Sequence, residues 1–244
     1  MLQQYIHTEI IHNFTAAKEI IPIVLELLEV SSVVDIGCGL GTWAKTAEEK
    51  GVKDFLGVDG VDLEQGDLKI PKQNFLSHDL TLPLKLDKKY DLAICLEVVE
   101  HLPESAANTI ISSLAQASDH ILFSAAIPGQ GGQNHLNEQW PSYWIKKFKQ
   151  HGYKFYDCIR PIIWNNERIE YWYRQNIFLV SKKSLPGLTG MTSGQFSDIV
   201  HPQTFSKLEE EYKRVSSIDP MSRVAFRKFI PYYFKQKLKK LFRS

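Results

Sequence analysis

The stretch VVDIGCGLGTW, residues 33–43, constrains the fold of this chain more than any other. An apolar run ends at Asp35, and glycines follow at alternate positions, Gly37, Gly39 and Gly41. Glycine loses more conformational freedom on folding than any other residue, so three of them beside a buried strand need a physical reason. The pattern predicts a strand, a tight or closely approached loop and then a helix, which is the ligand-binding corner of doubly wound α/β folds.

Strands and helices continue to alternate after this corner. Apolar runs predict strands at 32–36, 54–59, within 72–80, and at 90–96, 120–127, 153–159 and 176–182. Helical spacing predicts helices at 15–29, 41–51, 103–118 and 141–152. Pro22 either opens the first of these helices or kinks it. The alternation predicts a mostly parallel sheet with helices on both faces.

The α/β pattern stops near Ser184, which predicts a domain at 1–184 and a helical basic extension at 185–244. Residues 201–217 have helical character. The tail from 223 to 244 carries eight Lys and Arg residues and no acid.

Composition is that of an ordinary globular protein. The 244 residues are 43% hydrophobic and carry a formal net charge of +1, which gives no indication of a nucleic-acid partner. The sequence shows no signal peptide and no run of 18 apolar residues, so we expect a cytoplasmic protein. Three separated cysteines contain no CxxC pair and predict neither a disulfide framework nor a zinc knuckle.

The glycine loop does not fit two common nucleotide-binding motifs. A P-loop needs a Lys before Thr42, and a dinucleotide fingerprint needs a third glycine at that position. The actual pattern, D-x-G-x-G-x-G, resembles the first motif of class I S-adenosylmethionine-dependent methyltransferases. The resemblance implies a doubly wound seven-stranded sheet with the last strand antiparallel. It also implies that the backbone at Gly37, Gly39 and Gly41 passes against the methionine part of S-adenosyl-L-methionine, with Asp35 beside it.

Two further acids follow predicted strands. Asp59 lies 24 residues after Asp35, where an acid can accept hydrogen bonds from ribose hydroxyls. In the family an acid after the third strand and its neighbour hold the adenine, and the matching residues are Asp79 and Leu80. Taken alone, either aspartate would read as an ordinary turn residue.

The stretch YDLAICLEVVEHLPE resembles the fourth-strand motif of the same family, with Glu97 as a cofactor-lining residue. His101 follows closely and is a second candidate for the catalytic base, although a structural role is the alternative. The first candidate is His135, in the loop PGQGGQNHLNEQWPSYW, because imidazole exchanges protons near neutral pH.

The same loop offers polar and aromatic side chains to an acceptor. Trp140 and Trp144 would stack on a sugar face or anchor the next helix. The candidate polar contacts are Asn134, Asn137, Glu138 and Gln139. Residues 160–175 either cover the acceptor or form a β-hairpin, and Arg160, Arg168 and Arg174 would suit an anionic acceptor. No cluster of metal ligands is apparent, so the expectation is no metal and no metal-dependent catechol chemistry.

The predicted function is S-adenosylmethionine-dependent O-methylation of a sugar or glycan intermediate, by analogy with methyltransferases of bacterial surface-polysaccharide pathways. Alternatives are another small acceptor (a phosphonate, a phosphoramidate or a natural product) or a non-catalytic membrane-surface or nucleic-acid-binding module; NAD-linked chemistry fits least. The basic tail either docks on the inner membrane surface, where a lipid-linked acceptor would lie, or packs on the domain or on a second subunit of a homo-oligomer.

Overall fold

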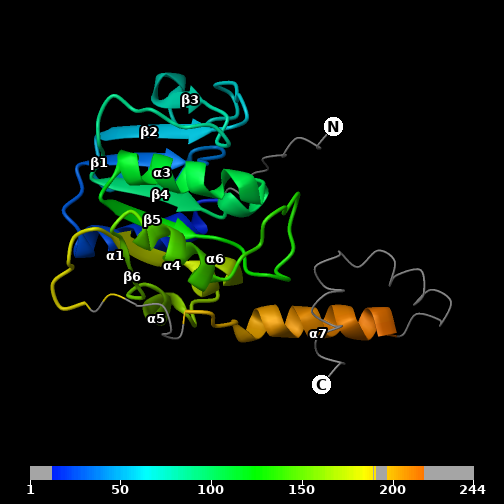
Figure 1. Cartoon of the computed structure of the whole chain (residues 1–244). Helices are drawn as coiled ribbons and strands as arrows, with labels where there is room; N and C mark the ends of the chain where they lie inside the picture. The colour runs from blue at the N-terminus through cyan, green and yellow to red at the C-terminus, as the bar shows by residue number, and fades with distance from the viewer. Residues whose placement is uncertain (1–12, 189, 191–196, 217–244) are drawn as a thin grey trace. The chain divides into compact units, whose positions relative to one another are not determined.

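The computed structural model of the chain describes residues 13–188, 190 and 197–216. Within them, seven strands form one sheet in the order β3-β2-β1-β4-β5-β7-β6 (Figure 1). The strands are β1 (Ser32–Ile36), β2 (Asp54–Asp59), β3 (Phe75–Ser77), β4 (Leu92–Leu96), β5 (His120–Ser124), β6 (Lys154–Tyr156) and β7 (Phe178–Ser181). The first five pair in parallel, and β7 runs antiparallel to both β5 and β6. The predicted fold class is confirmed.

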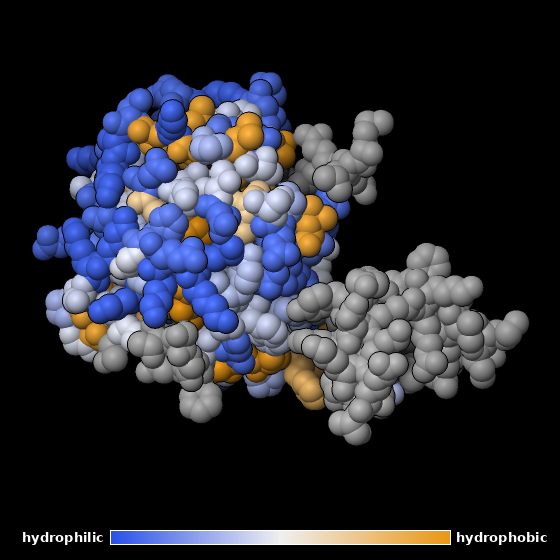
Figure 2. Space-filling view, viewed as in Figure 1, coloured by the Kyte–Doolittle hydropathy of each residue, from blue (hydrophilic) through white to orange (hydrophobic). Residues whose placement is uncertain are grey.

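Helices cover both faces of this sheet. They are α1 (Thr15–Leu27), α2 (Thr42–Glu49), α3 (Ala107–Ala117), α4 (Pro141–Lys149), α5 (Arg160–Ile163) and α6 (Tyr171–Asn176), with short 3₁₀ turns η1 (Lys72–Asn74), η2 (Val99–His101) and η3 (Glu104–Ala106). One apolar core holds Ile20 of α1 and Ala44 of α2, and a second holds Ile111 of α3 and Phe148 of α4. Every position of β1 and β4 is buried, as a sheet covered on both faces requires. The face drawn in Figure 2 is correspondingly mostly polar, with apolar side chains in small groups.

The glycine loop is built by backbone geometry and close packing. Gly37 has φ +83° and Gly41 has φ +84°, in the left-handed region that suits glycine. A Cβ on Gly37 would lie 2.3 Å from Cγ2 of Val98, and one on Gly41 would lie 2.8 Å from Cγ1 of Ile70. Contacts within the protein therefore explain why glycine is needed at these two positions, independently of any bound ligand.

The structure excludes one alternative at each of two places that the sequence left open. Pro22 does not open α1, because that helix begins at Thr15 and Pro22 lies inside it. Residues 160–175 form no β-hairpin but two short helices, α5 and α6. Pro161 stands in the first turn of α5, where the missing N–H costs nothing. Of the aromatic residues in this segment, Tyr173 packs on Trp43 of α2 and Trp164 packs on His201.

Contacts divide the chain into two compact units, 1–201 and 202–244. Unit 1 extends past the predicted boundary at 184/185, since the His201 amide donates to Oε1 of Gln175 and Arg160 donates to the Ser197 carbonyl. Unit 2 contains helix α7 (Pro202–Ser216), which confirms the helix predicted at 201–217. In the part of the chain that the structure describes, none of the helices is long and apolar enough to cross a membrane. The tail from 223 lies outside the described residues.

Candidate active site

A pocket of about 370 Å³ lies where the carboxyl ends of the parallel strands meet. Its walls come from the loops after β1 to β5 and from α6, a placement typical of ligand sites in open α/β sheets. Seven of the residues predicted from the sequence line it: Gly37, Asp59, Asp79, Leu80, Glu97, His101 and His135. The other three, Asp35, Gly39 and Gly41, do not.

Asp59 ties the glycine loop to the end of β2. Its Oδ2 accepts a hydrogen bond from the Gly39 amide at 2.8 Å, and its Oδ1 accepts one from the Val61 amide at 3.0 Å. The side chain is buried but lines the pocket. Each carboxylate oxygen can accept more than one hydrogen bond, so Asp59 can hold the loop and also receive hydroxyls from a ligand.

Asp35 lies next to the pocket but is not exposed to it. It is 2% exposed, and its Oδ2 makes no hydrogen bond with the described residues. Burial raises the pKa of Asp35 from 3.8 to about 7, and the nearby charge of Asp59 adds to the effect. Asp35 is not among the residues that line the pocket.

The far side of the pocket is formed by the end of β3. Asp79 is exposed, and its Oδ1 accepts hydrogen bonds from the hydroxyl and the amide of Thr81, which lower the pKa of Asp79. Leu80 is buried beside it. An anionic acceptor next to an apolar surface is the combination that an adenine-like ring and its amino group would need.

His135 occupies the opposite end, held by a carboxylate. Its Nδ1 lies 2.9 Å from Oε1 of Glu138, whose two oxygens also accept the amides of Gly129 and Gly131 at 2.7 and 2.8 Å. Burial opposes ionisation, but these hydrogen bonds lower the pKa of Glu138. Because a carboxylate accepts, Nδ1 is the donor in this contact, and in a neutral ring the lone pair would then lie on Nε2. Nε2 lies over Gly132, where an added Cβ would be 2.2 Å away.

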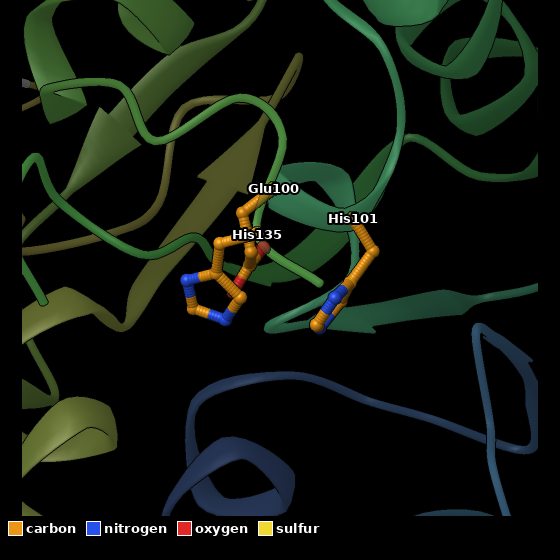
Figure 3. Close-up of side chains that lie close together, drawn as sticks. All are labelled: Glu100, His101 and His135. Atoms are coloured by element: carbon orange, nitrogen blue, oxygen red, sulfur yellow. The ribbon is translucent and has the colours of Figure 1, made fainter. Parts of the chain in front are cut away.

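His101 lies against His135, with ring centroids 4.9 Å apart (Figure 3). Glu100 lies beside both rings and is fully buried. The Glu100 carbonyl accepts the amides of Leu136 and Asn137 at 2.7 and 3.0 Å, which joins η2 to the loop that carries His135. One ligand atom from each of Glu100, His101 and His135 lies within 4.8 Å of the other two. The structure thus brings together three side chains of metal-binding type that the sequence analysis had not grouped.

Glu97 connects the loop after β4 to α6. Its oxygens accept hydrogen bonds from Gln130 Nε2 at 2.8 Å and Asn176 Nδ2 at 3.1 Å, and Asn176 also donates to Gln130 at 2.8 Å. Glu97 has φ +54°, an uncommon backbone conformation for a residue other than glycine. Such strain persists where surrounding contacts fix it, as this network does.

Three aromatic residues of α6, Tyr171, Trp172 and Tyr173, line the pocket, as does Trp43 of α2. The Trp43 and Tyr173 rings meet edge to face with centroids 5.3 Å apart. The sequence indicated this segment as a candidate cover for an acceptor, and it does form a wall. Gln130 and Gln133 also line the pocket and were missed, although they belong to the loop that the sequence had indicated.

The structure decides between the two roles left open for Trp144, and it places the four expected polar contacts of this loop outside the pocket lining. Trp144 does not stack on a ligand, because it is 1% exposed and packs on Phe123 with centroids 5.8 Å apart. It anchors α4, which was the alternative. The expected polar contacts Asn134, Asn137, Glu138 and Gln139 lie outside the pocket lining. Glu138 acts only through His135 and the glycine amides.

The three arginines offered for an anionic acceptor make protein contacts instead. Arg160 is buried, pairs with Asp157 and stacks on Phe178. Arg174 is buried and donates to the Trp164 carbonyl, and Arg168 pairs with Glu19. None of them is among the residues that line the pocket.

The fold and the pocket define a ligand-binding enzyme domain of the doubly wound type. Residues 10–158 match the family model described as a methyltransferase domain, and the chain belongs to that family. Its solved structural neighbours include the magnesium protoporphyrin IX methyltransferase from Synechocystis PCC 6803 with bound S-adenosylhomocysteine (TM-score 0.51, 20% identity, 71% of this chain and 84% of that one). The methyltransferase domain of bacterial CtHen1-C has a TM-score of 0.53 at 16% identity, covering 71% of this chain and 100% of that one. These identities show the shared fold.

Curated relatives are similar over shorter stretches. The ubiquinone biosynthesis O-methyltransferases of Leptothrix cholodnii and Nitrosomonas europaea are each 29% identical, over 33% and 36% of this chain and 37% and 40% of their own lengths. That of Alkalilimnicola ehrlichii is 24% identical over 40% of this chain and 42% of its own. The chain thus matches about two fifths of the length of these relatives. The predicted family is confirmed, and S-adenosylmethionine, the cofactor of methyltransferases of this kind, is confirmed at the level of the family.

Proposed function

We propose that this protein is an S-adenosylmethionine-dependent O-methyltransferase acting on a small-molecule acceptor. The observation that carries the proposal is the single pocket that joins Gly37 and Asp59 at one end to His101 and His135 at the other. Cofactor and acceptor can therefore occupy one pocket. The names of the curated relatives support transfer to oxygen.

Methyl transfer breaks the bond from the methyl carbon to the sulfonium and forms one to the acceptor oxygen. Holding donor and acceptor in line can supply most of the acceleration. The acceptor hydroxyl must also lose its proton. In this proposal Nε2 of His135 would receive it; the contact between Glu138 and Nδ1, which holds the ring, supports this role. The product S-adenosylhomocysteine then leaves with the methylated acceptor.

Cofactor binding is tested by calorimetric titration with S-adenosylhomocysteine. Asp59→Ala removes the acceptor for ribose hydroxyls and releases the Gly39 amide. Hydrogen bonds to a charged group are worth about 1.5–3 kcal/mol, so affinity should fall by at least about tenfold. Asp67→Ala, an exposed aspartate farther along the same connection, is the matched control. Binding of NADH in place of S-adenosylhomocysteine would overturn the proposal.

The role of His135 is tested by separating turnover from cofactor affinity. His135→Ala should lower kcat by about 10²–10⁴-fold, the usual contribution of a general base, and leave S-adenosylhomocysteine affinity unchanged. His151→Ala, outside the pocket, serves as control. Full activity of His135→Ala would show that His135 is not the general base and would leave His101 as the remaining candidate.

The acceptor class is a finer proposal. The acceptor predicted from the sequence is a sugar or glycan hydroxyl, either free or carried on a lipid. The aromatic wall of α6 suits the flat face of a sugar as well as a planar ring. A phosphonate, phosphoramidate or natural product is the alternative. Labelled S-adenosylmethionine offered with sugar nucleotides, phenols and phosphonates in parallel distinguishes these classes by which product carries the label.

The basic tail at 223–244 is proposed to contact an anionic membrane surface, which would bring the enzyme to a lipid-linked acceptor. Its eight basic residues and interspersed aromatic residues support this, at about 1 kcal/mol per basic residue near anionic lipid. The full chain should sediment with anionic vesicles at low salt, and a chain ending at 222 should not. If neither form sediments and truncation dissociates an oligomer, the tail is a subunit contact.

A further inference from the structure

The side chains at the acceptor end point to a metal site. We propose that Glu100, His101 and His135 bind one divalent transition-metal cation at the edge of the pocket. Cation binding itself does not depend on the proposed function, but its consequence for the acceptor rests on that function.

The geometry of the three side chains fits a common cation. Their ligand atoms lie within 4.8 Å of one another, and Figure 3 shows them converging from η2 and from the loop after β5. Imidazole nitrogens and carboxylate oxygens bind such cations at about 2.0–2.2 Å, so two ligands on opposite sides are about 4.2 Å apart. Small side-chain rotations would therefore complete the coordination.

Glu100 supplies the second, independent observation. The side chain is fully buried, and its Oε1 accepts the Ala126 amide at 3.2 Å. Its Oε2 receives no hydrogen bond from a donor among the described residues, and the Glu97 side chain lies next to this carboxyl. No Lys or Arg occurs among the described residues that line the adjoining pocket. A buried carboxylate without a partner is costly. A bound cation would neutralise this carboxylate and fill its unused oxygen.

The surroundings of His135 also fit a metal ligand. Histidine ligands usually donate their second ring N–H to a carboxylate, which fixes the ring and the tautomer. Glu138 provides that acceptor at Nδ1, and its own position is fixed by the Gly129 and Gly131 amides. Nε2 is left for the cation. The bonds from the Leu136 and Asn137 amides to the Glu100 carbonyl hold the two halves of the site together.

Two imidazoles and one carboxylate favour Mn²⁺, Fe²⁺, Co²⁺, Ni²⁺ or Zn²⁺ over Mg²⁺ and Ca²⁺, which prefer oxygen ligands. His101 and His135 line the pocket, so open coordination positions would face the acceptor. A hydroxyl bound there loses its proton to water more readily. The resulting oxyanion then attacks the methyl carbon. With a cation bound, His135 is therefore a ligand and no longer the proton acceptor.

The test uses the full chain after treatment with a chelator, titrated with Co²⁺ by calorimetry and by visible absorption. One Co²⁺ per chain should bind, with the absorption bands of nitrogen and oxygen coordination, and Mg²⁺ should not compete. Glu100→Gln, His101→Ala and His135→Ala should each weaken Co²⁺ binding at least tenfold. His151→Ala, outside the pocket, should not.

Titration with S-adenosylhomocysteine in the presence of chelator identifies which idea fails. A metal-free chain and a Glu100→Gln chain that both bind S-adenosylhomocysteine are folded and have an intact cofactor end. If such protein binds no Co²⁺, or if all three variants keep wild-type Co²⁺ affinity, the metal site is wrong and the proposed function stands. If Co²⁺ binds as expected but S-adenosylhomocysteine does not, the proposed function is wrong.

Discussion

Gly37 offers a direct test of how the strand–loop–helix corner is built. A Cβ there would lie 2.3 Å from Cγ2 and 2.6 Å from Cγ1 of Val98, in a residue whose φ is +83°. Gly37→Ala therefore adds two penalties, one from the left-handed backbone and one from overpacking. Gly152→Ala is the matched control, because Gly152 has φ +82° and a Cβ there would meet nothing within 4 Å.

The magnitudes separate the two penalties. A left-handed non-glycine residue costs about 1–2 kcal/mol, so Gly152→Ala should lower the free energy of unfolding by that amount. Overpacking a filled site adds about 1–3 kcal/mol, which brings Gly37→Ala to about 2–5 kcal/mol. Urea denaturation monitored by tryptophan fluorescence measures both variants against the wild type.

A double-mutant cycle with Val98→Ala identifies the clashing partner. Removing the two methyl groups of Val98 takes away the contacts at 2.3 and 2.6 Å and leaves only the Val98 Cβ, at 3.0 Å from the new Cβ. Gly37→Ala in that background should therefore lose most of its overpacking cost and approach the cost of Gly152→Ala. Additive costs of Gly37→Ala and Val98→Ala would refute this reasoning. They would show that the glycine is needed for the backbone alone.

Two further predictions concern buried charges. Because the pKa of Asp35 is about 7 in the folded chain and 3.8 without the fold, the native state loses stability as pH rises from about 4 to about 7. The free energy of unfolding of Asp35→Asn should therefore rise relative to that of the wild type over that range, by about 4 kcal/mol at most. Urea denaturation at pH 5 and at pH 8 measures this change. A difference between the two proteins that does not depend on pH would contradict the reasoning. Arg160→Lys should cost about 3–5 kcal/mol in the same assay, because a lysine cannot keep the paired bonds to Asp157 and the stacking on Phe178. Arg168→Lys, on the exposed pair with Glu19, should cost less than about 1 kcal/mol, and equal costs would show that burial does not matter here.

The sheet could be predicted from the sequence because its strands are continuous apolar runs. The runs at 32–36 and 54–59 became strands with the same bounds, and the parallel order follows from the helices between them. The segment 160–175 was harder, since aromatic residues suit a strand and a packed short helix equally well. Only tertiary packing decides between them.

The site was predictable one segment at a time but not as an assembly. Asp59 and Asp79 follow predicted strands, so their place at the pocket could be expected. His101 and His135 are 34 residues apart, and nothing in that spacing shows that their rings touch. They meet because the amides of Leu136 and Asn137 bind the carbonyl of Glu100, a contact between loops that has no local sequence signal. For the same reason the candidate metal site was missed.

A crystal structure of the chain with S-adenosylhomocysteine tests the central claim most directly. The ribose should lie on Asp59, the adenine beside Asp79 and Leu80, and the sulfur should face the end of the pocket that holds His101 and His135. That arrangement would place a methyl donor and an acceptor in one cavity. S-adenosylhomocysteine bound outside this pocket, or with its sulfur turned away from the two histidines, would contradict the account.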